Sequence, residues 1–157
     1  MARDPGATLR RAWAALAPLP GGTWLFSRLL GFMNPYSGAV GARVVELEPG
    51  HARLLLRDRR GIRNHLDSVH AIALANVAEL ASGLAMLAAL PAGARGIPVA
   101  IRIEYLKKAR GLLTAEARVA LPDVSVDGTH DFTSTVTDAA GDVVARATVT
   151  WKLGPAR

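Results

Sequence analysis

The stretch that decides the fold is VHAIALANVAELASGLAMLAAL, residues 69–90, an almost unbroken apolar run rich in alanine. Its length and composition predict one helix that is apolar on nearly every face, and such a helix has to be wrapped by the rest of the fold. Within the run, His70, Asn76 and Glu79 carry polar side chains that could take part in chemistry. A buried carboxylate is costly unless it is paired or used, so Glu79 is the residue that most needs a function.

Length and composition narrow the class of protein. The chain has 157 residues, enough for one domain with a substantial core. It has no cysteine, which excludes disulfides, thiolate metal sites and cysteine nucleophiles. Its net charge of +6 favours an anionic partner, such as a phosphate-bearing ligand, an acidic membrane surface or nucleic acid. With few aromatic residues and no glycine–aromatic RNA motif, nucleic-acid binding is not expected.

Two segments could be mistaken for membrane or targeting signals. The first 22 residues carry arginines and a short apolar stretch, but prolines and glycines interrupt it, so a secretory signal is not expected. Residues 69–90 are long enough to span a bilayer, yet His, Asn and Glu within them fit a buried helix better. We therefore expect a cytoplasmic protein without membrane contact.

The remaining elements follow from periodicity and turn residues. Residues 9–16 and 24–33 predict two short helices, and residues 39–47 and 51–57 predict a hairpin around Glu-Pro-Gly. A polar loop follows, and Asp67 or Ser68 is the expected N-cap of the long helix, which ends at Pro91.

The second half of the chain has the alternation of strands. In residues 99–106, Val99, Ile101, Ile103 and Tyr105 predict one buried face opposite a largely wet one. Strands at 113–121, 131–137 and 143–151 complete a predicted four-stranded meander. The order predicts an α+β domain in which an antiparallel sheet curls around one long helix, with residues 1–33 as a helical extension and 34–157 as the main domain. The sheet edges must be covered or paired, which favours a homodimer.

The polar residues around the start of the long helix could form a site for acyl transfer or hydrolysis. The amides of Ala71 and Ile72, in the first helical turn, could hold an oxyanion, and Glu79 could act as nucleophile or general base, with Asn64 and His70 nearby. On one ideal helix, residues 70 and 79 lie about 180° apart. Either His70 lies in the loop before the helix, or the site is shared between subunits. We favour a site between two subunits, with Glu79 from one and residues 64–72 from the other.

Simpler interpretations stand beside this one. Glu79 could be a structural carboxylate, His70 a hydrogen-bonding residue at the helix start, and Asp67 only a cap. His65, His70 and Glu79 lack the spacing of a metal site, so neither a metal nor another cofactor is expected. The sequence also lacks the nucleophile-elbow, P-loop and dinucleotide-binding motifs.

Two further clusters invite a functional interpretation. Lys107, Lys108 and Arg110 form a compact basic group that could bind phosphates or could be a solvated turn. The apolar residues of the N-terminal helices could cover a substrate entrance or touch a membrane, although simple packing is the favoured interpretation; they are Trp13, Trp24, Leu25, Phe26, Leu29 and Leu30.

The segment NHLDSVHAIALANVAE, residues 64–79, resembles the Asn-x-x-Gly-x-x-His-Gly-Gly motif of hotdog-fold thioesterases, with the acidic residue nine positions after the histidine. The resemblance is to the phenylacetate-degradation and acyl-CoA thioesterase type, and it covers residues 34 to 153, including IEYLKKARG at 103–111 and TDAAGDVVA at 137–145. Asp67, Ala71 and Ile72 stand where that family has glycine, and Ile72 adds bulk there.

The resemblance implies a hotdog homodimer, possibly a tetramer, that hydrolyses an acyl thioester of coenzyme A or of an acyl carrier. Glu79 would be nucleophile or base, His70 and the Ala71 amide of the opposite chain would polarise the carbonyl, and Asn64 would help to position it. Asp67 and Ile72 would line the substrate site, and the basic group would bind the coenzyme A phosphates. The alternatives are a non-catalytic acyl-CoA or lipid-binding hotdog protein and a dehydratase-like hotdog enzyme, although the sequence offers no clear His and Asp pair for the latter.

Overall fold

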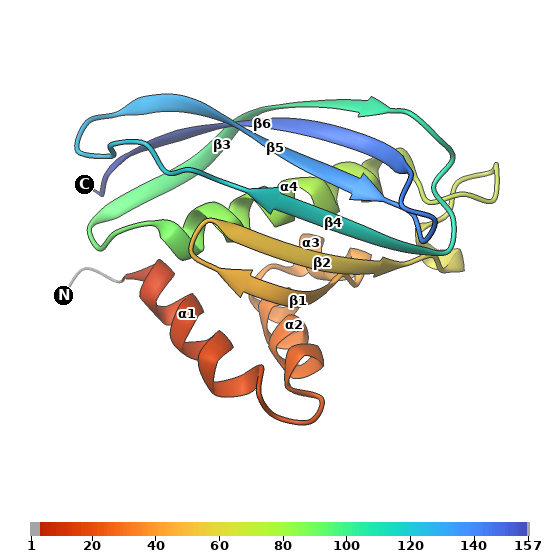
Figure 1. Ribbon diagram of the computed structural model, residues 1–157, viewed down its shortest axis with the longest axis horizontal. Helices are drawn as coiled ribbons and strands as arrows, with labels where there is room; N and C mark the ends of the chain where they lie inside the picture. The colour runs from red at the N-terminus through yellow and green to blue at the C-terminus, as the bar shows by residue number, and fades with distance from the viewer. Residues whose placement is uncertain (1–3, 157) are drawn as a thin grey trace.

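A six-stranded antiparallel sheet wraps around one long helix in the computed structural model, which describes residues 4–156 (Figure 1). The strand order in the sheet is β1-β2-β4-β5-β6-β3. The elements in chain order are α1 (Pro5–Leu16), α2 (Gly22–Met33), α3 (Pro35–Val40), β1 (Arg43–Glu48), β2 (His51–Arg57), a 3-10 turn η1 (Arg60–Ile62), α4 (Ala71–Ala89), β3 (Ala94–Tyr105), β4 (Leu112–Arg118), β5 (Gly128–Thr137) and β6 (Val143–Pro155). This is the hotdog arrangement, so the predicted α+β fold with its wrapped helix and N-terminal helices is confirmed.

The helix α4 forms the centre of the core, as its composition predicts. Small and apolar side chains such as Val77, Ala78 and Ala85 are completely buried against the sheet. The helix is long and apolar enough to span a bilayer, but most of it is buried inside the fold. Wrapping by the sheet therefore accounts for its apolar character.

The helix begins later than predicted, and its cap is His70. The Nδ1 atom of His70 accepts a hydrogen bond from the Ile72 amide at 3.1 Å. The prediction that Asp67 or Ser68 caps the helix is wrong, because both lie in a bend and the chain after them is still extended. The Val69 amide donates to the Ala109 carbonyl at 2.8 Å, and Val69 also pairs with Arg63.

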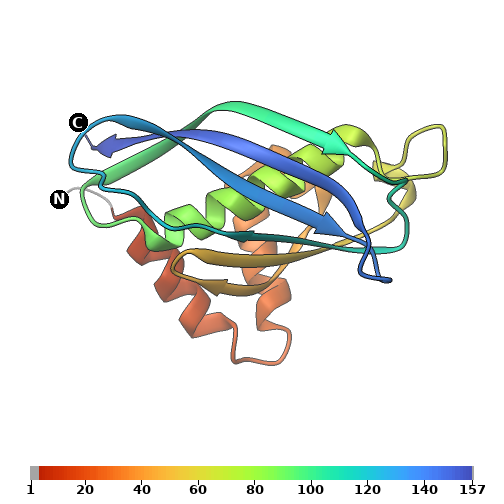
Figure 2. The ribbon, with the colours of Figure 1, turned by 45° about the horizontal axis from the view of Figure 1, so that its top comes forward.

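The predicted meander is correct for β4, β5 and β6, which pair in chain order, and wrong for β3. The strand β3 does not pair with β4 but with β6, so that β3 lies at an edge of the sheet and β4 near its middle (Figure 2). After β3 the chain crosses the end of the sheet, where the amides of Leu106 and Lys107 both donate to the Val144 carbonyl. Alternation reports which side chains share a face but not which strand is the neighbour.

The edge strand β3 is more exposed than its pattern predicts. Ile101, Ile103 and Tyr105 lie opposite buried residues of β6, and so face the helix side of the sheet. Yet Ile101 is 45% exposed and Tyr105 47% exposed, because β3 extends beyond the part of the sheet that α4 covers. Within one chain the predicted burial of this face is reached in part by Ile103, which packs against the core, and not by Ile101 or Tyr105.

The N-terminal helices cover the opposite edge of the molecule (Figure 1). Ser27 of α2 accepts a hydrogen bond from the Val44 amide of β1 at 2.9 Å, and Arg10 of α1 donates to the Ala88 carbonyl at the end of α4. Trp13 packs edge-on against Phe26, with ring centroids 5.0 Å apart. Packing is thus confirmed for Trp13, Phe26 and Leu30, whereas Trp24, Leu25 and Leu29 are exposed.

Residues 39 and 40, predicted to begin the first strand, instead end α3. The helix stops at Gly41, whose φ of 74° is left-handed and suits a residue without a Cβ atom. The division into an extension at 1–33 and a main domain at 34–157 stays a prediction.

Candidate active site at the start of the central helix

Asn64 organises the loop that precedes α4. Its side-chain oxygen accepts hydrogen bonds from the Leu66 amide at 2.9 Å and from the Ser68 amide and hydroxyl at 3.3 and 3.2 Å. Such a side chain reproduces the bonding of a backbone turn and fixes the loop. The Asn64 oxygen is therefore occupied, and its side-chain NH2 group is the part that can reach a ligand.

Asp67, the predicted substrate-binding residue in this loop, has a φ of 51°. It occupies a position where the resembled family has glycine, and left-handed backbone explains that preference. Asp tolerates this conformation better than most residues, which explains how the loop keeps its shape without glycine. The exposed Asp67 side chain makes no hydrogen bond to another described residue.

The backbone at Asp67 gives a stability prediction. We expect Asp67→Gly to leave the free energy of unfolding equal or slightly higher, and Asp67→Val to lower it by about 1–2 kcal/mol, because a β-branched side chain clashes in left-handed backbone. Urea denaturation of the three proteins measures this order. A Val variant as stable as the Gly variant would show that the loop does not hold this conformation.

The segment after β3 holds the same loop from the other side. Arg110 donates to the carbonyls of Leu66 and Asp67 at 3.0 and 2.9 Å, and the Tyr105 hydroxyl donates to the Ala71 carbonyl at 3.0 Å. Between the loop, the helix start and this segment lies a pocket of about 360 Å³. Its lining residues include Asn64, Ser68, Ala71, Leu74, Tyr105 and Lys108.

Of the two amides predicted to hold an oxyanion, those of Ala71 and Ile72, only the first is free among the described residues. The Ile72 amide is occupied by His70, which corrects the expectation that it could hold an oxyanion. The Ala71 amide has no hydrogen-bond acceptor among residues 4–156 and stands at the positive end of the helix dipole. Because Nδ1 of His70 accepts, a neutral His70 carries its proton on Nε2 and can donate from there.

Glu79 is half-buried in the middle of α4. Among the described residues its carboxylate has no ion pair or side-chain hydrogen bond, and burial raises the pKa of this carboxyl above its usual range. Its Oε1 atom lies beside Gly83, next to the ring of Trp151 on β6. Trp151 pairs with Pro98 of β3, so Glu79 lies on the side of α4 that turns toward the uncovered edge strand.

The two halves of the predicted site are separated within one chain. Nine helical residues from His70 to Glu79 correspond to about 13 Å along the axis and about 180° around it. Glu79 does not line the pocket that Asn64 and Ala71 share. Ile72, predicted to line the substrate site, is exposed and lies about 20° from Glu79 around the helix, on the same face.

The pKa of Glu79 predicts a pH dependence of stability. A raised pKa means that the folded protein keeps a proton that the unfolded chain releases, so the free energy of unfolding falls as the pH rises from the ordinary carboxyl pKa through the raised one. Glu79→Gln removes the titrating carboxyl group and, with it, this fall in the free energy of unfolding. We expect the Gln variant to gain on the wild type between acidic and neutral pH in urea denaturation, whereas a pH-independent difference would contradict the raised pKa.

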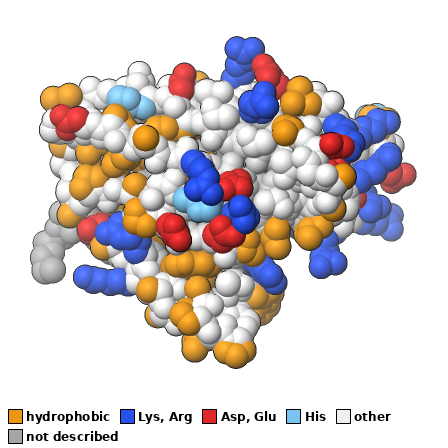
Figure 3. All heavy atoms as spheres, viewed as in Figure 1, with side chains coloured by type: hydrophobic (Ala, Val, Ile, Leu, Met, Phe, Trp, Pro, Cys, Tyr) orange, Lys and Arg blue, Asp and Glu red, His pale blue; other side chains and the backbone are white. Residues whose placement is uncertain are grey.

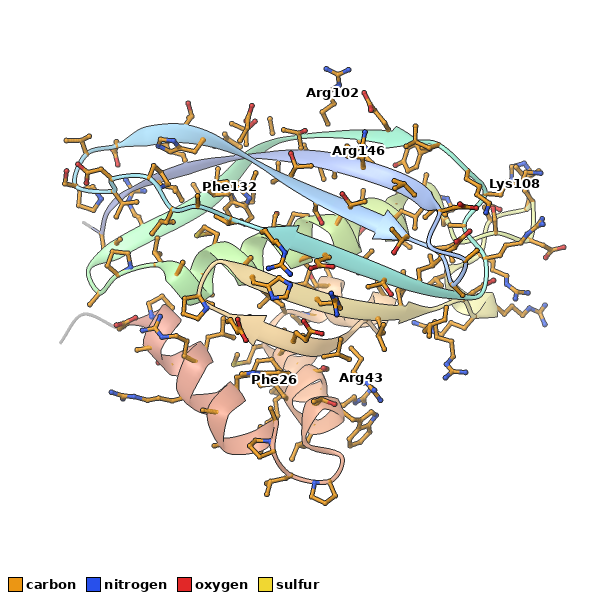
Figure 4. The ribbon with its side chains drawn as sticks, in the orientation of Figure 1. Phe26, Arg43, Arg102, Lys108, Phe132 and Arg146 are labelled. Atoms are coloured by element: carbon orange, nitrogen blue, oxygen red, sulfur yellow. The ribbon has the colours of Figure 1, made fainter. Side chains whose placement is uncertain are left out.

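The three basic candidates do not act as one group. Lys107 forms ion pairs with Asp138 and Asp142 at 2.6 and 2.7 Å, and these raise its pKa. Arg110 donates hydrogen bonds to the loop carbonyls of Leu66 and Asp67. Lys108 has neither an ion pair nor a hydrogen bond from its side chain among the described residues. Figure 4 shows it at the loop end of the molecule, where Lys and Arg side chains gather in Figure 3.

Two neighbours of the site, Tyr105 and Asn76, were given no role in it from the sequence. Tyr105 was predicted as a strand residue only, and nothing in its spacing indicates its bond to Ala71. The side-chain oxygen of Asn76 is buried with no hydrogen-bond partner in the described structure, and Asn76 precedes Glu79 by three residues, on a neighbouring turn. Spacings of three and four residues link Asn76, Glu79 and Gly83 on one helix face, and this signal was available in the sequence.

Comparisons with known structures agree with this architecture. The structural-genomics protein APC5556 is 33% identical with a TM-score of 0.83, over 95% of this chain and 99% of that chain. PA5026 of Pseudomonas aeruginosa, called a "Probable Thioesterase", is 26% identical with a TM-score of 0.73, over 87% of this chain and 97% of that one. smu.793 of Streptococcus mutans, solved with acetyl CoA, has the same fold at 23% identity and a TM-score of 0.64, over 74% and 91%. No curated protein matches the sequence.

The fold and these neighbours define a hotdog protein of the thioesterase-like class. The sequence profile of one family, "Domain of unknown function (DUF4442)", matches residues 22–153. The chain belongs to this family.

Proposed function

We propose that the protein is an acyl-CoA thioesterase that works as a homodimer, in which Glu79 of one chain faces residues 64–72 of the other. The observation that carries this proposal is the half-buried, unpaired carboxylate of Glu79 on the open side of α4. Carboxylates with a raised pKa in partly buried sites are candidates for general-base chemistry.

The uncovered edge of the sheet supports the homodimer. The twelve-residue strand β3 has one neighbour, β6, and keeps its other edge free, while the apolar side chains of Ile101 and Tyr105 remain exposed beside it. A long free edge with apolar side chains favours pairing with another strand. Pairing with β3 of a second copy would bring the open side of α4 in each chain toward the helix start of the other.

In such a dimer, hydrolysis uses Glu79 of one chain together with the helix start of the other. Glu79 takes a proton from a water molecule, which attacks the thioester carbonyl carbon. The carbonyl oxygen becomes an oxyanion and accepts hydrogen bonds from the partner's Ala71 amide and His70 Nε2. The carbon–sulfur bond breaks, the thiolate leaves and takes up a proton, and the acyl group becomes a carboxylic acid. Asn76, whose oxygen is unpartnered, is placed to hold the water.

The substrate assignment rests on the neighbours and on charge. PA5026 is called a "Probable Thioesterase", smu.793 was solved with acetyl CoA, and a similar Streptococcus pneumoniae protein was solved with coenzyme A. Lys108, the basic candidate that no other described residue engages, is suited to a coenzyme A phosphate.

The amide of Ala71 can be removed without disturbing the helix. Proline lacks the N–H group and is well tolerated at the first helical position, and His70 before it already has the extended ψ of 141° that proline requires. We expect Ala71→Pro to lower kcat by about 10²–10³-fold with an unchanged melting temperature. Ala71→Ser, which keeps the amide, is the matched control. Equal activity of the two variants would exclude this amide as an oxyanion donor.

Release of free thiol from short, medium, long and aryl acyl-CoAs tests the proposed function. We expect turnover with one class of acyl group and none after Glu79→Gln. If the wild type is inert on every substrate while acyl-CoAs raise its melting temperature, the protein is an acyl-CoA-binding hotdog protein, and the proposal of catalysis is wrong.

A further inference from the structure

The outer face of α2 and the start of α3 present large apolar side chains to solvent. We call this surface the N-terminal patch; it consists of Trp24, Leu25, Leu29, Phe32, Met33 and Tyr36. Phe32 is 84% exposed and Trp24 57% exposed. The inner face of the same helix already supplies Phe26 to the core, so the outer residues are not needed there. An exposed apolar surface of this kind is typical of an interaction site.

The segment that carries the N-terminal patch has charges of one sign. Residues 5–45 contain four arginines and no Asp or Glu. The Arg28 guanidinium lies over the Trp24 ring, 5.9 Å from its centroid. Arg28 and Arg43 both line a groove of about 580 Å³ between α2, α3 and the start of β1, and neither side chain has an ion pair or hydrogen bond within the described structure. Figure 4 shows Arg43 beside α2.

We propose that the N-terminal patch docks the protein on an anionic lipid bilayer. Aromatic and aliphatic side chains then lie at the boundary between headgroups and acyl chains, and Arg28 and Arg43 reach the lipid phosphates. Arginine and tryptophan suit this boundary, because each joins an apolar body to a polar group. This revises the expectation of no membrane contact and does not depend on catalysis.

The same charges disfavour the other occupants of the N-terminal patch. A symmetric contact with a second copy would bring the free arginines of both chains together, with no carboxylate in residues 5–45 to pair with them. The patch also lies on the helical side of the molecule, while the free strand β3 forms the opposite edge (Figure 1).

Flotation of the full chain with lipid vesicles tests the proposal. We expect it to float with vesicles of phosphatidylcholine and phosphatidylglycerol, and much less with phosphatidylcholine alone. Arg28→Gln with Arg43→Gln should lower binding to the anionic vesicles by roughly fivefold per arginine. Phe32→Ser should lower it by about tenfold or more, since burial of the ring is lost. The control is Val126→Ser, an equally drastic change at an exposed position between β4 and β5, which should bind as the wild type does.

Tryptophan fluorescence gives a second measurement of vesicle binding, made on the folded protein. Trp151 is buried and Trp13 is partly buried against the core, whereas Trp24 is 57% exposed. A blue shift on adding anionic vesicles should therefore come mainly from Trp24 and be largely lost in Trp24→Phe. The proposal is overturned if the protein does not bind anionic vesicles, or if the arginine variants bind as the wild type does. Self-association without lipid that Phe32→Ser abolishes would also overturn it, and would assign the patch to a protein contact.

Discussion

Glu79→Gln abolishes thioester hydrolysis, with an expected fall in kcat of about 10²–10⁴-fold, while acyl-CoA binding stays within a few fold. The amide has the shape of the carboxyl group but cannot take a proton from water. Thiol release under saturating substrate measures the rate, and the rise in melting temperature with added acyl-CoA measures binding. Glu48→Gln, the same change at an exposed position at the end of β1, should leave both unchanged.

A Gln variant that keeps wild-type turnover would make Glu79 a structural residue. The raised pKa alone would not rescue its catalytic role, because burial raises the pKa of any carboxyl that lacks a partner. In the rate profile, the same raised pKa should place the acid limb of kcat/KM above the usual range of a carboxyl group.

Ile101→Glu converts the proposed dimer into a monomer. Ile101 faces the helix side of β3 and is exposed in the single chain, so the charge is solvated in the monomer but would be desolvated in a contact between two β3 strands. A cost of about 3 kcal/mol corresponds to a rise in the dimer Kd of more than about a hundredfold. Light scattering coupled to size-exclusion chromatography measures the mass.

The monomeric variant should also lose hydrolysis, although it keeps Glu79, His70 and Ala71 intact. Val126→Glu adds the same charge at an exposed apolar position between β4 and β5 and should remain a dimer. A wild type that is a monomer at assay concentrations and active would contradict the role of β3.

The central element of the fold could be predicted because its signal is local. An alanine-rich run with no polar face predicts a helix that the rest of the fold surrounds. The helix α4 spans Ala71–Ala89, within the predicted 69–90. The neighbour of β3 could not be predicted, because the alternation in residues 99–106 does not report which strand pairs with it. The exposure of Ile101 has the same origin: the pattern marks an apolar face but does not say that a second chain has to cover it.

The candidate site, too, could be predicted from the sequence only in part. The spacing raises two alternatives, a His70 outside the helix or a shared site; His70 is the extended N-cap of α4, and the shared site stays a prediction. The cap was missed because His70 is an uncommon N-cap. Asp67 and Ser68 are residue types that commonly cap helices, but they lie before the position where this helix begins. The division of Lys107, Lys108 and Arg110 depends on Asp138, Asp142 and the loop carbonyls, which are distant in the sequence.

Mixing two inactive variants tests most directly whether each active site takes residues from two chains. Ala71→Pro and Glu79→Gln chains are unfolded together, refolded and assayed for thiol release. In a mixed dimer, Glu79 of the first chain meets the intact Ala71 amide of the second, so one of two sites is complete. Half of the dimers are mixed, and activity should return to about a quarter of wild type per chain. If the mixture is as inactive as its parents although mixed dimers form, each site lies within one chain, and the account is wrong.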